Sequence, residues 1–198
     1  MANAELAQRG AAEVRFDGVC KSYGVNRVLR GLNFTLEAGG VYCLMAPSGS
    51  GKTTLFRALL GLEPCDAGSI TGVSSGDISM MFQEDRLCEA LSAIENVALV
   101  RDGSSGEAMR LLDAMELSAE AGKLPIALSG GMQRRVALAR ALNFGGDMLL
   151  LDEPFKGLDE ALRARVIAAV RGRFPLTVIA THDRAEAEAL GMTGEILV

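Results

Sequence analysis

The segment APSGSGKTT, residues 46–54, combines glycines, hydroxyl side chains and one lysine in a way that suits phosphate binding. Its internal glycines allow the backbone to curl so that consecutive N–H groups point at phosphate oxygens. Lys52 brings a positive charge to the β- and γ-phosphates of a nucleotide, and the hydroxyl of Thr53 can ligate Mg²⁺. We therefore predict an ATP-binding phosphate loop made of Ala46, Pro47, Ser48, Gly49, Ser50, Gly51, Lys52, Thr53 and Thr54. Ala46 replaces the first glycine of the pattern G-x-x-x-x-G-K-T, a change that we expect the loop to tolerate.

An acidic pair, Asp152 and Glu153, ends the apolar run MLLLDEPF at residues 148–155. A buried parallel strand would deliver both carboxylates to the carboxyl edge of the sheet, where ligands bind in such folds. Asp152 suits the coordination of Mg²⁺, and Glu153 suits the activation of a water molecule as a general base. An acidic pair at a strand end is more often only the start of a turn, but the phosphate loop favours the functional interpretation.

A further anion-binding surface is predicted at LSGGMQ, residues 128–133. Ser129 is a natural N-cap for a helix that runs to about residue 142, and Gly130 and Gly131 expose backbone N–H groups at the helix start. This would be a second anion-binding surface on the same chain.

Strands and helices alternate along the chain. Apolar and polar residues alternate at 14–23 and 32–36, which predicts half-buried antiparallel strands. Short apolar runs predict buried strands at residues 41–45, 78–82, 148–151 and 176–180. A helix is expected from residue 53 to about residue 60, and Gly61 ends it. The alternation indicates a mainly parallel sheet with helices on its faces.

The composition limits the class of partner. The net charge of −5 and the pI of about 5.0 give no electrostatic reason to bind nucleic acid. No stretch approaches the roughly 20 apolar residues that span a bilayer, and the first residues lack a secretory pattern. The cysteines have no paired spacing, so we expect reduced thiols at Cys20, Cys43, Cys65 and Cys88. We expect a cytoplasmic protein that reaches a membrane only through a partner.

The run LSGGMQRRVALARAL closely resembles the signature of ABC ATPases, the ATP-binding subunits of ABC transporters. The resemblance covers essentially the whole chain after residue 13. It implies an α/β fold, with a P-loop NTPase core around a mainly parallel sheet, an N-terminal antiparallel β subdomain and a small helical insertion.

The same resemblance implies a division of the chain. We expect residues 1–12 to form a flexible tail and residues 13–198 to form one ABC ATPase domain. Within it, residues 13–84 and 143–198 would make the catalytic core with the β subdomain. Residues from about 85 to 142, which include the signature, would make the helical subdomain.

Roles for single residues follow from the resemblance. Tyr23 matches the aromatic residue that stacks on adenine, and Gln83 matches the glutamine that reaches Mg²⁺ and the attacking water. Asp159, in the sequence GLD after the acidic pair, matches a loop that crosses between subunits. His182 matches the histidine that contacts the γ-phosphate, and Gln133 belongs to the signature that binds nucleotide.

The partners are also implied by the resemblance. In a head-to-tail dimer of two copies, the signature N–H groups of one chain face the γ-phosphate held by the other. ATP joins the dimer, and its Mg²⁺-dependent hydrolysis opens it. A separate membrane permease would dock near Gln83 and the helical insertion, on the inner face of the cell membrane, with a solute-binding protein as a candidate third partner.

The segments FQEDRL and DEPF look most like those of importers of nitrate, sulfonates and taurine, although Cys88, Glu89 and Ala90 replace the Leu-Pro-Trp usual there. An exporter or lipoprotein-release subunit is the alternative. DNA-repair and ribosomal relatives are disfavoured by the acidic pI, the lack of a long coiled coil and the single cassette. A scaffold that does not hydrolyse ATP is disfavoured by Glu153 and His182. The chain ends with GEILV, so we expect no regulatory domain.

Overall fold

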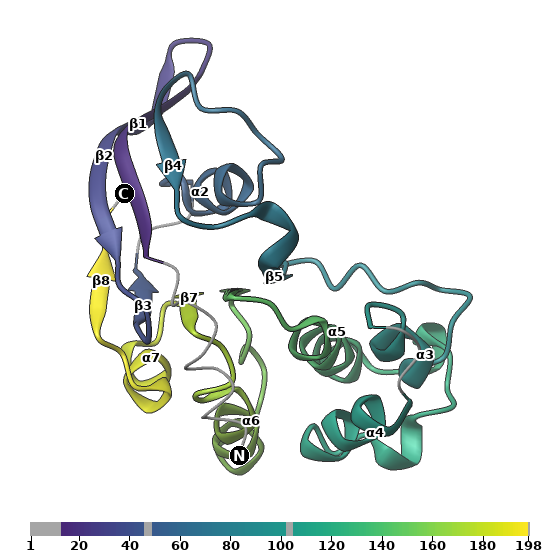
Figure 1. Ribbon diagram of the computed structural model, residues 1–198. Helices are drawn as coiled ribbons and strands as arrows, with labels where there is room; N and C mark the ends of the chain where they lie inside the picture. The colour runs from purple at the N-terminus through teal and green to yellow at the C-terminus, as the bar shows by residue number, and fades with distance from the viewer. Residues whose placement is uncertain (1–12, 46–48, 102–104, 198) are drawn as a thin grey trace.

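The computed structural model describes residues 13–45, 49–101 and 105–197. The expected tail at 1–12 and part of the expected turn at 101–106 lie outside these ranges. The described chain forms an antiparallel sheet, a larger parallel sheet and a set of helices beside it (Figure 1). The predicted α/β class, with both kinds of sheet, is confirmed.

The three-stranded antiparallel sheet has the order β2-β1-β4. Its strands are β1 (Val14–Tyr23), β2 (Asn26–Leu36) and β4 (Ala67–Thr71). In β1 the side chains of Val14 and Phe16 are buried, as the period-two alternation predicts. Val19 is also buried, out of phase with them, because the pairing with β2 shifts register between Phe16 and Val19. Strand β2 starts earlier than the predicted residue 32, because a tight turn at Gly24 (φ 59°) lets it pair along the whole of β1. The sequence pattern did not predict β4.

The five-stranded parallel sheet has the order β5-β6-β7-β3-β8. Its strands are β3 (Val41–Leu44), β5 (Ile78–Met81), β6 (Met148–Asp152), β7 (Leu176–Ala180) and β8 (Gly194–Ile196). All residues of β6 and β7 are buried, because elements cover both faces of the sheet. The four predicted buried strands are confirmed, and β8 was not predicted.

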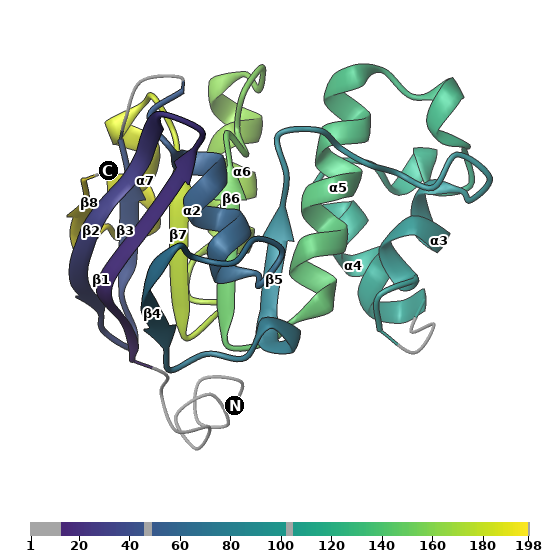
Figure 2. The same ribbon diagram turned by 90° about the horizontal axis from the view of Figure 1, so that it is seen from above.

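Alternate residues of β6 point into separate cores on the two faces of the sheet. Met148 and Leu150 pack with α2 (Lys52–Leu59) and the antiparallel sheet, so that α2 lies between the two sheets (Figure 2). Leu149 and Leu151 pack on the other face, where the remaining helices lie. These helices are α3 (Ala93–Ala98), α4 (Ser105–Ala114), α5 (Gly130–Phe144), α6 (Glu160–Val170) and α7 (Arg184–Leu190). Short 3₁₀ turns occupy Ser75–Asp77, Ser118–Glu120 and Pro125–Ala127.

Helices α3, α4 and α5 pack together beside β5, at the opposite end from the antiparallel sheet (Figures 1 and 2). Within the described ranges, no helix combines the length and the apolar character that a membrane span requires.

The buried side chain of Asn96 holds the segment that leads into α3. Its Oδ1 accepts a hydrogen bond from Cys88 N at 2.7 Å, and its Nδ2 donates to the carbonyls of Cys88, Leu91 and Ser92. We expect Asn96→Ala to lower the free energy of unfolding by about 3 kcal/mol, because it removes four hydrogen bonds made by a fully buried side chain. Asn143, equally buried, is the control: its Nδ2 donates to Val97 O, while its Oδ1 has no partner in the described chain. Asn143→Ala should cost about 1 kcal/mol. Urea unfolding monitored by circular dichroism measures both, and equal losses would contradict the assignment.

Candidate functional site

The parallel strands bring four loops to one edge of the sheet. Strand β3 leads to the phosphate loop, β5 leads to Gln83, β6 ends at Asp152, and β7 leads to His182. Their carboxyl ends surround a cleft of about 530 Å³. Of the residues expected from the sequence, the cleft is lined by Gly49, Gly51, Lys52, Thr53, Thr54, Gln83, Asp152, Glu153 and His182. Catalytic and phosphate-binding candidates far apart in the sequence thus share one cleft.

The described part of the phosphate loop is shaped to bind an anion. Gly51 is the N-cap of α2 with φ 115°, a conformation that side chains rarely adopt, and a Cβ there would lie 2.8 Å from Val28 Cγ1. The first N–H groups of α2 have no partner within the helix and point toward its N-terminus. The hydroxyl of Ser50 is buried without a hydrogen-bond partner in the described chain, as expected of a group that meets a ligand. Ala46, Pro47 and Ser48 lie outside the described residues.

Asp152 is a buried carboxylate, with 5% of its surface exposed. Burial and the nearby charge of Glu153 raise its pKa, and the charges of Lys52, Arg134 and His182 partly oppose that shift. Keeping this buried carboxylate ionised in the folded chain costs free energy, and a bound cation would offset that cost. Asp152 therefore suits the binding of a metal ion.

Glu153 has an unusual backbone conformation for a residue with a side chain. Its φ is 51°, in the left-handed region, which costs about 1–2 kcal/mol for an ordinary L-residue. Its N–H donates to Ala180 O at 2.8 Å, and its carboxylate Oε1 lies 3.0 Å from His182 Nε2. Despite this short distance, the buried Oε1 receives no hydrogen bond of acceptable geometry from the described residues. This oxygen therefore keeps an acceptor position that no described residue uses, as expected of a group that acts on a ligand.

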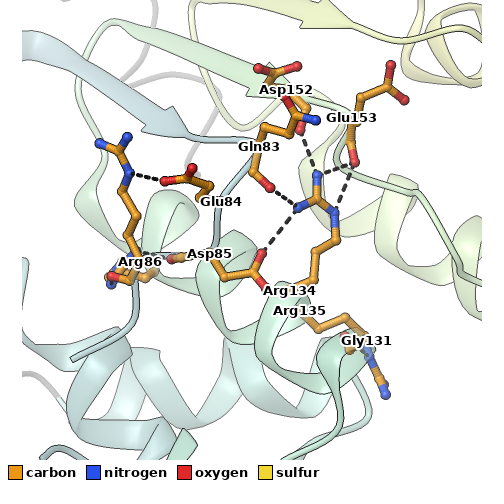
Figure 3. Close-up of polar contacts among 10 residues, drawn as sticks. Gln83, Glu84, Asp85, Arg86, Gly131, Arg134, Arg135, Asp152 and Glu153 are labelled. Carbon is orange, nitrogen blue, oxygen red and sulfur yellow. Dashed lines mark hydrogen bonds and ion pairs between the residues drawn. The ribbon is translucent and has the colours of Figure 1, made fainter. Parts of the chain in front are cut away.

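Arg134, on α5, supports the backbone of the acidic pair from below the cleft (Figure 3). Its Nη2 donates to Asp152 O at 2.7 Å and its Nε donates to Glu153 O at 3.1 Å. Its Nη1 donates to Gln83 O at 3.0 Å. No local pattern in the sequence indicates this role for Arg134, because a charged residue on a helix is usually solvated.

Three residues that line the cleft could each offer an oxygen ligand to a metal ion: Thr53 its hydroxyl, Gln83 its amide and Asp152 its carboxylate. All three also line an adjoining pocket of about 340 Å³, so they lie on a shared wall. Among the described residues, no group of three or more His, Cys, Asp or Glu side chains could hold a metal ion. One carboxylate with neutral oxygen donors fits Mg²⁺, which keeps several waters and takes phosphate oxygens as ligands.

Other residues predicted from the sequence do not line the cleft. Tyr23 is half-exposed at the end of β1 and hydrogen-bonds to Glu63, which lowers the pKa of that carboxyl. Asp159 caps α6 by accepting from Leu162 N at 3.0 Å. Gln133 donates to the carbonyls of Pro125 and Leu128.

The signature residues that were expected to bind nucleotide stand at the exposed start of α5. Ser129 is the predicted N-cap and accepts from Met132 N at 3.3 Å. Ser129, Gly130 and Gly131 are exposed, and none of them lines the cleft of its own chain.

The cleft also contains residues that the sequence analysis did not single out: Val28, Lys156, Thr181, Asp183 and Glu186. Lys156 adds a cation to the cleft, and its position directly after DEPF could have drawn attention to it. Val28 lies in the antiparallel sheet, so close to Gly51 that a Cβ on this glycine would lie 2.8 Å from Val28 Cγ1. Thr181 donates to Glu186, a hydrogen bond between the β7 end and α7 that no local pattern indicates.

The sequence model of the ABC transporter family matches residues 29–156. An aliphatic sulfonates import ATP-binding protein, SsuB 2 of Burkholderia cenocepacia (strain HI2424), is 38% identical over 184 residues, covering 86% of this chain and 68% of that protein. An Fe(3+) ions import ATP-binding protein, FbpC 1 of Rhizobium meliloti (strain 1021), is 37% identical over 208 residues, covering 93% of this chain and 58% of that protein.

Solved structures show the same fold. A dimeric ATP-binding cassette in a post-hydrolysis state, bound to ADP and Pi, matches with a TM-score of 0.80 and 27% identity, over 89% of this chain and 90% of that one. A bacterial Atm1-family ABC exporter with ATP bound matches with a TM-score of 0.79 and 25% identity, over 89% of this chain and 36% of that one.

The raised pKa of Asp152 predicts an effect of Asp152→Asn on stability. A carboxyl whose folded-state pKa is raised contributes stability below its unfolded pKa, and loses it as the pH rises through the folded value. At pH 7 without nucleotide, we therefore expect Asp152→Asn to melt at or above the parental temperature, while the stabilisation by Mg²⁺ and ATP shrinks. Differential scanning fluorimetry with and without ligand measures both. Asp113→Asn, at an exposed position, is the control and should change neither. A variant that melts several degrees lower without ligand would contradict the assignment.

Proposed function

The chain belongs to the ABC transporter family and is an ATPase of that family, and from this we propose that it drives the import of a solute through a separate membrane permease. The observation that carries the catalytic part of the proposal is the Glu153 carboxylate. Its Oε1 has no hydrogen-bond partner among the described residues and lies 3.0 Å from His182 Nε2, in the same cleft as Lys52. A base, a cation and a phosphate loop in one cleft are the parts that phosphoryl transfer to water needs.

In the proposed mechanism, Lys52 and the N–H groups at the start of α2 hold the β- and γ-phosphates. Glu153 orients a water molecule for in-line attack and accepts its proton, and His182 contacts the γ-phosphate. Thr53, Gln83 and Asp152 would hold Mg²⁺, which neutralises charge that develops on the phosphate oxygens. The adenine would lie against Tyr23.

A second copy of the chain is proposed to complete each site. The exposed N–H groups of Gly130 and Gly131 and the Ser129 hydroxyl are suited to bind an anion, but they do not line the cleft of their own chain. In a head-to-tail dimer they would face the γ-phosphate on the other copy's Lys52. Asp159 and Gln133 would lie in the same interface. ATP would then close the dimer, and hydrolysis would open it.

For the direction of transport, the support comes from the relatives. The sulfonate and Fe(3+) proteins are named as import subunits, and the segments FQEDRL and DEPF agree with importers of small organic solutes. We propose a position on the inner face of the cell membrane, bound to the permease, with a solute-binding protein as a further partner and no nucleic acid. Since those two relatives name different solutes, the permease and the binding protein would select the solute. Export is the second candidate, because an exporter shares this fold with a TM-score of 0.79.

Replacing the proposed base tests the catalytic assignment. We expect Glu153→Gln to keep its affinity for ATP, to accumulate as an ATP-bound dimer in size-exclusion chromatography, and to lose at least about 100-fold in kcat, because general bases contribute about that much. The parental chain in the same assay is the control. Hydrolysis by the variant at the parental rate would rule out Glu153 as the base.

The composite site is tested by mixing two inactive variants. Lys52→Ala and Ser129→Arg should each abolish hydrolysis, since each damages both sites of its homodimer. A mixed dimer of the two contains one intact site, formed by Lys52 of one chain and Ser129 of the other. We therefore expect ATPase activity to return when the two proteins are mixed, as measured by phosphate release. Mixtures that stay inactive, although chromatography shows that mixed dimers form, would contradict a site shared between chains.

A further inference from the structure

Arg134 connects two loops of the cleft through one side chain (Figure 3). On one side, its guanidinium donates to the carbonyl oxygens of Asp152 and Glu153. On the other, its Nη1 donates to Gln83 O at 3.0 Å and to Asp85 Oδ1 at 3.2 Å. Only 12% of the Arg134 side chain is exposed. The planar guanidinium fixes the direction of each donor, so these contacts hold the two loops in one relative position.

The contact with Glu153 bears on catalysis because the backbone of that residue is strained. A left-handed conformation at a residue other than glycine persists only where its surroundings hold it. The hydrogen bond from Glu153 N to Ala180 O holds one side of the residue, and Arg134 holds the carbonyl on the other. This conformation places the carboxylate beside His182.

A second arginine of α5 provides a natural comparison. Arg140 donates to the carbonyls of Asp85 and Arg86, each at 2.8 Å, so it also holds the loop after β5. Among the described residues, however, Arg140 has no hydrogen bond to Asp152 or Glu153. Arg140 therefore supports only the loop after β5, whereas Arg134 connects that loop to the acidic pair. Comparing variants of the two arginines distinguishes these two effects.

We propose that Arg134 is a positioning residue for ATP hydrolysis: it holds Glu153 in its strained conformation and makes that conformation depend on the loop from Gln83 to Asp85. The proposal rests on the proposed role of Glu153 as the base. A shift of the Gln83 loop would move the guanidinium away from the Glu153 carbonyl, which would keep only the longer hydrogen bond from Lys156 N at 3.4 Å. The carboxylate would then leave its place beside His182, while the phosphate loop would remain intact.

The first test compares Arg134→Gln with Arg140→Gln. We expect Arg134→Gln to lower kcat by about 10- to 100-fold with little change in KM for ATP, because misplacing a catalytic group costs rate and leaves the phosphate contacts in place. Arg140→Gln should lower kcat less than about 3-fold. Arg134→Lys keeps the charge without the planar donors, so it should resemble Arg134→Gln, and it replaces that variant if the glutamine variant does not fold. Equal kcat values for the Arg134 and Arg140 variants would overturn the proposal.

The second test is a pair of double-mutant cycles. In the Glu153→Gln background, Arg134→Gln should change the residual rate less than 2-fold, because it acts through the side chain that is already disabled. Asp85→Asn should lower kcat by about 3-fold alone and should have no further effect in Arg134→Gln. Effects that multiply in both cycles would mean that Arg134 acts only on general stability, and would overturn the proposal. A Glu153→Gln variant that hydrolyses ATP at the parental rate would instead refute the proposed base, and is thus a distinct failure.

Discussion

The parallel hydrogen bonding of β3, β5, β6 and β7 is the constraint on which the rest of the structure depends. Parallel strands in register end at the same edge, so Leu44, Met81, Leu151 and Ala180 bring the loops that follow them together. The strands are four or five residues long and mostly buried, so a shift of register would disturb the packing on both faces and displace the loops together. Cleft and core are therefore stabilised by the same interactions.

Most of this edge could be predicted from the sequence, because a short, mostly apolar run marks each of these strands. The runs at 78–82, 148–151 and 176–180 are apolar over four or five residues, and each is followed by a polar residue that lines the cleft. Strand β4 could not be found this way, since AGSIT is mostly exposed and its pairing with β1 is non-local. The proposed role of Arg134 could not be predicted from the sequence either. Its partners are mainly backbone carbonyls, which every residue has, so no residue type marks them. Val28 lines the cleft although it lies in the antiparallel sheet, a placement that depends on non-local packing.

One chain provides only part of the proposed composite site in its own cleft. Phosphate loop, carboxylates and histidine share the cleft, whereas Ser129, Gly130 and Gly131 stand exposed at the start of α5. The same helix carries Arg134, five residues beyond Ser129, on the side that faces the acidic pair. In the proposed dimer, α5 would thus contact the nucleotide of the other chain with its first turn and the base of its own chain with its second.

The left-handed backbone of Glu153 has a consequence for sequence design. Glycine adopts this conformation without strain, so a sequence chosen for folding stability alone would replace Glu153, and it would give up the carboxylate in doing so. Redesign of this chain for thermostability should therefore keep position 153 fixed and seek its gains on the outer surfaces of α4 and α6. Any screen that ranks variants by melting temperature would otherwise select against the proposed base.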